Sequence, residues 1–215
     1  MTAVLFDLDG TLIGTRRLYL ECYRRALEPY VGRALSDDEL LAYKPRSEIR
    51  LLKAIAGDDA IATCLADFHR HYEALHDELF QGIYPGIPEL LASLRQRRTP
   101  IGLVTGKSRR SWEITTTRAQ LGPFDVIVLD DDVSAPKPDP EGILLALARL
   151  RADPATTLYV GDSISDMVAA RAAGVRPAAV LWSKRESERE SFALRAQAEG
   201  AILLHEPGEL LTALG

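Results

Sequence analysis

The chain begins with a short apolar run that ends in two carboxylates. Residues 3–7 have the pattern of a buried strand, Asp9 follows Asp7 after one apolar residue, and Gly10 permits a turn. Apolar runs of this length that end in turn residues are typical of strands inside a parallel sheet. Because such sheets keep their chemistry at the carboxyl ends of their strands, the pattern predicts an acidic pair at that edge.

Helical periodicity replaces the strand pattern over residues 15–82. Apolar residues recur there every three or four positions, and from Ile61 to Leu79 they alternate four- and three-residue steps, as the seam of a coiled coil does. The segment from Ser36 to Glu39 has the pattern of a capping box, which starts another helix. We therefore expect residues 15–82 to form a small bundle of antiparallel helices.

Strands and helices alternate along the rest of the chain. This alternation predicts an α/β fold with a doubly wound parallel sheet, which the first strand joins. The expected core consists of residues 1–14 and 83–215, and the helical unit of residues 15–82 is inserted above the carboxyl ends of its strands. The predicted strands cover residues 101–105, 126–129, 158–160, 179–182 and the region of Ile202, and the predicted helices cover residues 108–120, 140–151, 164–173, 186–198 and 209–214.

The composition narrows the class of protein and of partner. The chain has 215 residues, of which 47% are hydrophobic and 27% charged, and no apolar run approaches the roughly 20 residues of a membrane span. Asp7 and Asp9 interrupt the first apolar run, so we expect a cytoplasmic protein with no membrane partner. A formal net charge of -5 argues against nucleic acid as a partner. We further expect a monomer or a homodimer.

Candidate chemistry follows three later strands as well. Thr105 and Gly106 offer a hydroxyl and backbone donors that suit a phosphate oxygen. Prolines on both sides of Lys137 stiffen its loop and so hold the positive charge of the lysine in one position. Asp162 and Asp166 lie four residues apart at the start of a helix, where both can face the same crevice. The carboxyl ends of four strands thus carry polar residues of complementary types.

The aspartates at these strand ends predict a metal ion. Asp7, Asp9, Asp162 and Asp166 would repel one another, by about 4 kcal/mol for a close pair at 4 Å with an effective dielectric constant of 20. A cation would offset this repulsion. The candidate ligands are hard oxygens, and a phosphate could complete the coordination shell, which favours Mg²⁺. A metal, a lysine, a hydroxyl and a free carboxylate together indicate phosphoryl transfer.

Taken together, these residues resemble a known set of motifs. The segment from Asp7 to Thr11, Thr105, Lys137 and the segment from Gly161 to Asp166 are similar to the four motifs of the haloacid dehalogenase (HAD) superfamily. The resemblance implies a Rossmann-like core and a helical cap domain. It covers essentially the whole predicted core.

The resemblance also implies catalytic roles. Asp7 would be the nucleophile that forms an aspartyl-phosphate, and Asp9 would be the general acid for the leaving group and then the base for water. Thr105 and Lys137 would hold the phosphoryl oxygens. These roles agree with the chemistry, because an ionised aspartate attacks a phosphate dianion only where cations offset the repulsion.

The metal ligands follow from the same resemblance. Asp7, the backbone carbonyl of Asp9 and Asp162 would bind Mg²⁺. Asp166 would support the metal or Lys137.

The reaction expected is that of a phosphoric monoester hydrolase. An aspartate at position 9 favours phosphate transfer, because the dehalogenases of the superfamily have no aspartate there and need no metal. The segments 131–133, 137–141 and 161–163 look similar to the phosphoglycolate phosphatase and pyrophosphatase branch. Residues 14–17 depart from that branch, since they lack the acidic residue often seen there.

The expected function is therefore a Mg²⁺-dependent phosphatase that acts on a small phosphorylated metabolite such as phosphoglycolate. The alternatives are an inorganic pyrophosphatase and a phosphosugar mutase that returns the phosphoryl group to a sugar. A catalytically silent interaction module is disfavoured, because every catalytic position is filled.

Substrate contacts are expected from both parts of the chain. Thr11 and Gly106 belong to the motifs, whereas Lys44 and Arg46 form a cationic loop that would suit a second anionic group of the substrate.

Two further clusters of polar residues are expected to be solvated surface. One is the helical face of His69, Glu73 and His76, and the other is the charged run from Lys184 to Glu190.

Overall fold

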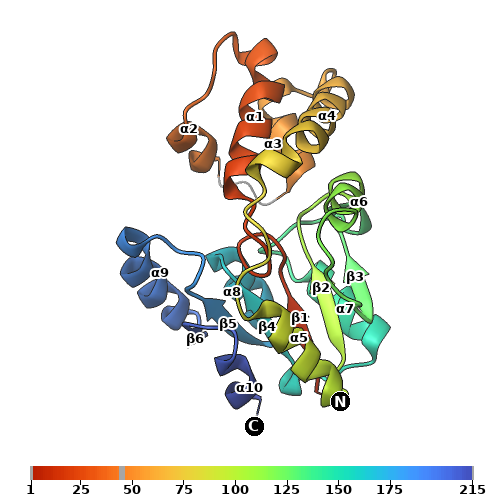
Figure 1. Cartoon of the computed structure of the whole chain (residues 1–215), viewed down its shortest axis with the longest axis vertical. Helices are drawn as coiled ribbons and strands as arrows, with labels where there is room; N and C mark the ends of the chain where they lie inside the picture. Colours follow the sequence, from red (N-terminus) through yellow and green to blue (C-terminus); the bar gives the residue numbers. More distant parts are fainter. Residues whose placement is uncertain (1, 44–46, 215) are drawn as a thin grey trace. The chain divides into compact units, whose positions relative to one another are not determined.

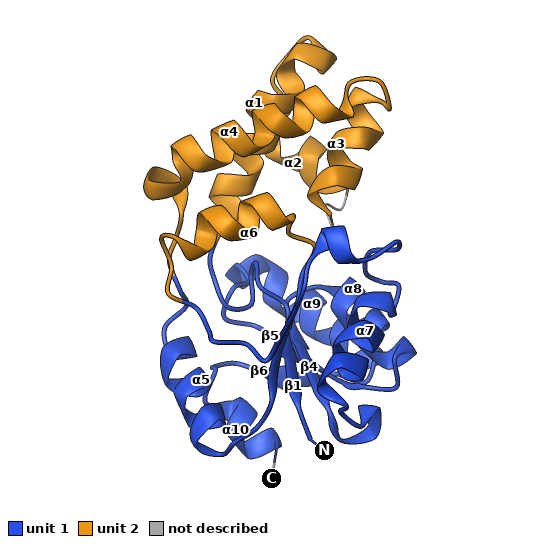
Figure 2. Ribbon diagram, turned by 90° about the vertical axis from the view of Figure 1, so that its right-hand side faces the viewer, with its two compact units in different colours: residues 1–14, 83–105, 121–215 blue, residues 15–82, 106–120 orange. Residues whose placement is uncertain are grey.

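The chain folds into two compact units. The structure, a computed structural model, describes residues 2–43 and 47–214. Unit 1 consists of residues 1–14, 83–105 and 121–215, and unit 2 of residues 15–82 and 106–120 (Figure 1, Figure 2). Each unit has an interior of its own.

Unit 1 is built on a six-stranded sheet with the strand order β3-β2-β1-β4-β5-β6. Every neighbouring pair is parallel. This is the strand order of the Rossmann fold. The predicted doubly wound α/β architecture is therefore confirmed. The strands are β1 (Val4–Phe6), β2 (Ile101–Val104), β3 (Val126–Val128), β4 (Leu158–Gly161), β5 (Arg176–Val180) and β6 (Ile202–Leu204).

Helices cover both faces of the sheet, with α5 and α10 on one face and α7 and α8 on the other (Figure 2). Apolar side chains of α7 and α8 pack with Leu5 and Val104 of the sheet in one cluster of buried residues. Strands β1, β2 and β4 are buried on both faces, which explains their continuous apolar sequences. The helical elements of unit 1 are α5 (Ile87–Gln96), η1 (Asp130–Asp132), α7 (Glu141–Leu150), η2 (Pro154–Thr156), α8 (Ile164–Ala172), α9 (Glu186–Ala198) and α10 (Glu209–Ala213).

The order of the strands makes β1 the topological switch point of the sheet. Strand β1 pairs with β2 on one side and with β4 on the other, so the chain connections run outward in opposite directions from this point. Ligands of open α/β sheets bind outside the carboxyl ends of the strands at such a switch point. The residues that follow β1 and β4 are therefore the first candidates for a site.

Strand β5 begins earlier than its sequence pattern predicts. The prediction placed a strand at residues 179–182, whereas β5 covers Arg176–Val180. Arg176 is exposed and Pro177 has no backbone N–H to donate, and both features are more typical of a loop than of a strand. The residues from Leu181 to Lys184 consequently form a loop at the carboxyl end of the sheet.

Unit 2 is a set of packed helices around its own apolar interior. In helix α4, Phe68, Tyr72 and Leu75 of the predicted seam are buried. The other seam residues are partly buried and pack against the same cluster, namely Ile61, Leu65 and Leu79. In the described part of the chain, no helix combines the length and the apolar character that crossing a membrane requires. The helices of unit 2 are α1 (Arg16–Val31), α2 (Asp37–Ala42), α3 (Glu48–Ala56), α4 (Ile61–Leu79) and α6 (Arg109–Thr116).

The segment of residues 106–120 groups with the helices of unit 2, although the sequence pattern placed it in the core. Its helix α6 packs on α4. Ser111 Oγ donates a hydrogen bond to Glu48 Oε2 at 2.9 Å, and both side chains are buried. Buried polar contacts of this kind join the buried side of the segment to the other helices of unit 2.

His76 is buried in unit 2, which contradicts the expectation of a solvated surface. Its side chain packs against Tyr72 and Phe80, with ring centroids at 5.7 and 4.6 Å. Neither ring nitrogen has a hydrogen-bond partner among the described residues. Burial, together with the charges of Arg118 and Lys107, lowers the pKa of His76 to about 4, although the charge of Asp77 acts in the opposite direction.

This burial predicts that the stability of the fold decreases in mild acid. The unfolded state binds a proton near the ordinary histidine pKa of about 6.5, whereas the folded state resists protonation down to about pH 4. Stability is therefore lost as the pH falls through this window. Between pH 7 and pH 5, we expect the free energy of unfolding to decrease by about 2 kcal/mol less in His76→Phe than in the wild type. Urea unfolding at both pH values measures this difference, and an unchanged loss would contradict the assignment to His76.

Candidate active site

Four loops at the carboxyl ends of the strands carry the predicted site residues of unit 1. Asp7 directly follows β1, Thr105 follows β2, Lys137 lies between β3 and α7, and Asp162 and Asp166 follow β4. Thr105 extends the sheet, because its backbone N–H donates to the carbonyl of Val128 at 3.0 Å. The strand register thus delivers residues from distant parts of the sequence to one edge.

Lys137 is the centre of the hydrogen-bond network at this edge. Its Nζ lies 2.8 Å from Asp7 Oδ1 and 2.6 Å from Asp166 Oδ1. It also donates to the Tyr159 hydroxyl at 3.0 Å. Burial alone would lower the pKa of Lys137, but Asp166 and Asp7 outweigh it and hold the pKa well above its usual value. Lys137 therefore stays charged beside Asp7.

The loop that presents Lys137 is held by more than its prolines. The carboxylate of Glu141 accepts hydrogen bonds from the backbone N–H groups of Ser134 at 3.0 Å and Ala135 at 2.8 Å. Asp139 Oδ1 accepts from the backbone N–H of Glu141 at 2.9 Å. These contacts tie both sides of the loop to the first turn of α7.

Asp166 holds Lys137 in place. One of its oxygens contacts Lys137, and the other accepts from the backbone N–H of Ser163 at 2.9 Å and from its hydroxyl at 2.6 Å. The Ser163 side chain in turn caps α8, which makes a capping box. Because both oxygens of Asp166 already accept hydrogen bonds, this carboxylate suits the support of Lys137 better than direct metal ligation.

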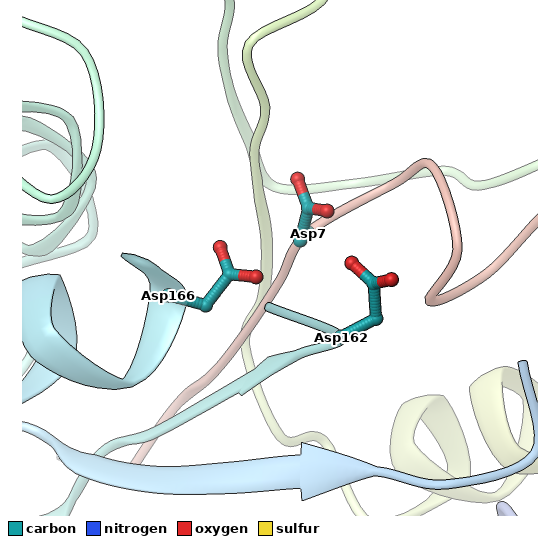
Figure 3. A group of neighbouring side chains, drawn as sticks. All are labelled: Asp7, Asp162 and Asp166. Atoms are coloured by element: carbon teal, nitrogen blue, oxygen red, sulfur yellow. The ribbon is translucent and has the colours of Figure 1, made fainter. Parts of the chain in front are cut away.

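Asp7, Asp162 and Asp166 form a group that could hold a metal ion. One oxygen from each lies within 4.8 Å of the others. Figure 3 shows the three carboxylates around one small space. Burial raises the pKa of Asp7 and the charge of Lys137 opposes this; with the added charges of Asp166 and Asp162, the pKa is about 8. A divalent cation would offset this charge, so the residues fit the hard oxygen site that Mg²⁺ prefers.

Asp9 and Gly10 form the turn after β1. The side chain of Asp9 is partly exposed and does not belong to the group of three carboxylates. Gly10 has a φ of +81°, and a Cβ at this position would lie 2.4 Å from Asp162 Oδ2. A side chain there would therefore displace the carboxylate of Asp162.

The roles of the predicted substrate residues stay predictions. The Thr11 side chain is fully buried, and its hydroxyl has no hydrogen-bond partner within the part of the chain that the structure describes. Gly106 belongs to unit 2. Lys44 and Arg46 lie outside the described residues.

Two residues of the site are missing from the sequence prediction. Tyr159 lies within β4, where its hydroxyl donates to the carbonyl of Val104 at 2.9 Å and accepts from Lys137. Lys184 Nζ lies 2.7 Å from Asp162 Oδ2, which corrects the expectation of a solvated lysine. The available signal for the first residue was a tyrosine in an otherwise apolar strand, two positions before Gly161.

Comparison with known proteins places this site in a family. The sequence profile of the haloacid dehalogenase-like hydrolases matches residues 4–180. Pyrophosphatase PpaX from Bacillus velezensis is 36% identical over 190 residues, which cover 85% of this chain and 84% of that protein.

Solved structures agree with this match over nearly the whole chain. A hydrolase from Pseudomonas syringae superimposes with a TM-score of 0.82 at 25% identity, covering 100% of this chain and 98% of that one. CbbY from Rhodobacter sphaeroides, solved in complex with phosphate, has a TM-score of 0.78 at 28% identity. The match covers 97% of this chain and 95% of that one. The predicted resemblance is thus confirmed, and the chain belongs to the haloacid dehalogenase-like hydrolase family.

Proposed function

We propose that the protein is a Mg²⁺-dependent phosphatase in which Asp7 is the nucleophile. The observation that carries this proposal is the contact of Lys137 with Asp7, made by a lysine that Asp166 and Tyr159 hold in place. A fixed ammonium beside a carboxylate can bind a phosphoryl oxygen and offset the repulsion between two anions. The family membership of the chain supports the same chemistry.

In the first half of the proposed reaction, an Asp7 oxygen attacks phosphorus and the bond from phosphorus to the leaving oxygen breaks. Asp9 gives its proton to that oxygen. In the second half, Asp9 takes a proton from water, whose oxygen attacks the same phosphorus. The bond to Asp7 then breaks and inorganic phosphate leaves. Asp9 suits both transfers because its partly exposed side chain lies outside the carboxylate group that would hold the metal.

We assign Asp7, Asp162 and the backbone carbonyl of Asp9 as the residues that would hold Mg²⁺. When bound, the metal would supply positive charge that offsets the charge of the phosphoryl group. Asp166 keeps Lys137 charged and oriented, and Thr105 and Lys137 would hold phosphoryl oxygens. The high pKa of Asp7 supports the need for this second cation, because a protonated carboxyl cannot attack.

The substrate proposed is a small phosphorylated molecule, with inorganic pyrophosphate and a phosphomonoester such as phosphoglycolate as the two candidates. The name of the Bacillus velezensis relative favours pyrophosphate. The phosphate complex of CbbY supports a site for phosphate in this fold. Contacts from Lys44 and Arg46 to a second anionic group stay a prediction.

Phosphate release from a panel of compounds tests the proposal. The panel contains pyrophosphate, phosphoglycolate and glucose 1-phosphate, each with Mg²⁺ and with a chelator in its place. We expect release from at least one of the first two compounds, and only with the metal. Conversion of glucose 1-phosphate to its 6-phosphate without free phosphate would favour the mutase. Release that is insensitive to the chelator would contradict the metal assignment.

A further inference from the structure

The loop that follows β5 lies against the turn that follows β1. Trp182 Nε1 donates a hydrogen bond to the carbonyl oxygen of Thr11 at 3.0 Å. The backbone N–H of Lys184 donates to the carbonyl of Leu181 at 3.2 Å, and its carbonyl accepts from Arg189 Nε at 3.3 Å. These hydrogen bonds hold the backbone of Lys184 beside the site.

The ammonium group of Lys184 forms an ion pair with Asp162. Its Nζ lies 2.7 Å from Asp162 Oδ2 and 4.7 Å from the centre of the Phe192 ring. Only 17% of the Lys184 side chain and 21% of the Asp162 side chain are exposed. An ion pair that is largely shielded from water and also packs on an aromatic ring is held more firmly than a surface pair.

The two lysines of the site divide the three carboxylates between them. Lys137 contacts Asp7 and Asp166, and Lys184 contacts Asp162. Asp162, one of the carboxylates assigned to the metal, is therefore already paired with the ammonium group of Lys184. A divalent cation at this site must share Asp162 with the ammonium group or displace it.

We propose that Lys184 competes with the divalent cation for Asp162 and so keeps the metal affinity of the site moderate. This inference rests on the proposed function, because it requires a metal at the three carboxylates. An ammonium group and a metal that share one carboxylate repel each other. Loss of the ammonium charge therefore strengthens metal binding.

Titration calorimetry with Mg²⁺ alone tests this proposal on the full chain, without any substrate. We expect Lys184→Met to bind Mg²⁺ about tenfold more tightly than the wild type, equivalent to about 1.4 kcal/mol. Methionine keeps an unbranched side chain that can still pack on Phe192. Lys184→Arg keeps the positive charge, so its affinity for Mg²⁺ should equal that of the wild type.

The matched control is Lys53→Met, which removes an exposed lysine of unit 2 that pairs with Asp58 at 2.5 Å. Its Mg²⁺ affinity should equal that of the wild type, because solvent screens distant surface charges. The increase in Tm with Mg²⁺ concentration gives a second readout for each variant.

The outcomes separate this inference from the proposed function. The inference is supported if Lys184→Met binds Mg²⁺ more tightly than the wild type while Lys184→Arg and Lys53→Met do not. Equal affinity in wild type and Lys184→Met overturns the inference and leaves the metal site intact. Weaker binding by Lys184→Met also overturns it, because Lys184 would then orient Asp162 for the metal. Absence of Mg²⁺ binding in every variant overturns the metal assignment itself.

Discussion

Replacement of Asp7 by asparagine is expected to reduce phosphate release by on the order of 10⁴-fold or more. Asparagine has nearly the same size, and its amide oxygen can still accept a hydrogen bond from Lys137, which lies 2.8 Å from Asp7. The neutral amide is too weak a nucleophile to form the bond to phosphorus. Binding of phosphate can therefore survive while the chemical step is lost. Steady-state and single-turnover phosphate release measure both properties.

A second aspartate provides the control for this variant. Asp59 is exposed and lies in unit 2, so Asp59→Asn removes one carboxylate without a change at the strand ends. It should keep the turnover of the wild type. Thermal unfolding of both variants checks that each is folded. Turnover of Asp7→Asn within about tenfold of the wild type would show that Asp7 is not the nucleophile.

The acidic residues of the candidate site could be predicted because their signals are local. Asp7 follows an apolar run and precedes a turn glycine, and Asp162 has the same position after β4. Asp166 follows by one helical turn. The parallel sheet then brings these strand ends to one edge, and this follows from the alternation of strands and helices alone.

The residues that hold these aspartates could not be predicted in the same way. Tyr159 belongs to a buried strand, and its sequence context is that of a core residue. Lys184 stands in a run of charged residues whose pattern is that of a solvated helix start. Each acts through a partner that only the packing of the whole sheet brings near.

The same limit applies to the fold. The order of strands and helices follows from hydrophobic periodicity, but the unit to which a helix belongs depends on its contacts. Helix α6 has an ordinary amphipathic pattern, and nothing in that pattern says which surface its buried face meets. Its place in unit 2 depends on polar contacts such as that between Ser111 and Glu48, which are 63 positions apart.

These polar contacts converge on a buried lysine of unit 2. Lys107 Nζ donates to the hydroxyl of Tyr19 at 2.6 Å and to that of Tyr72 at 2.8 Å. The Tyr19 hydroxyl donates to one oxygen of Glu48, and Ser111 donates to the other. Burial would raise the pKa of Glu48, but a hydrogen bond from His69 and the charge of Lys107 outweigh it and lower the pKa. The lowered pKa keeps Glu48 ionised in the interior of unit 2.

Lys107→Met is expected to destabilise the protein by about 3–5 kcal/mol, because it leaves the buried charge of Glu48 without the ammonium group of Lys107. The loss corresponds to a decrease in Tm of roughly 6–20 °C for a chain of this size. Guanidinium unfolding followed by circular dichroism measures it. Lys53→Met is the matched control, since Lys53 is exposed, and its stability should stay within about 0.5 kcal/mol of the wild type.

The double variant Lys107→Met with Glu48→Gln distinguishes a charge effect from a packing effect. If the unpaired charge of Glu48 causes the loss, its removal should restore a large part of the stability, so that the double variant is more stable than Lys107→Met alone. If the loss came only from altered packing, the two substitutions would add. Additive losses, or a loss below about 1 kcal/mol for Lys107→Met, would contradict the view that these two buried charges stabilise each other. Non-additive losses would show that their coupling ties residues 106–120 to the helices of unit 2.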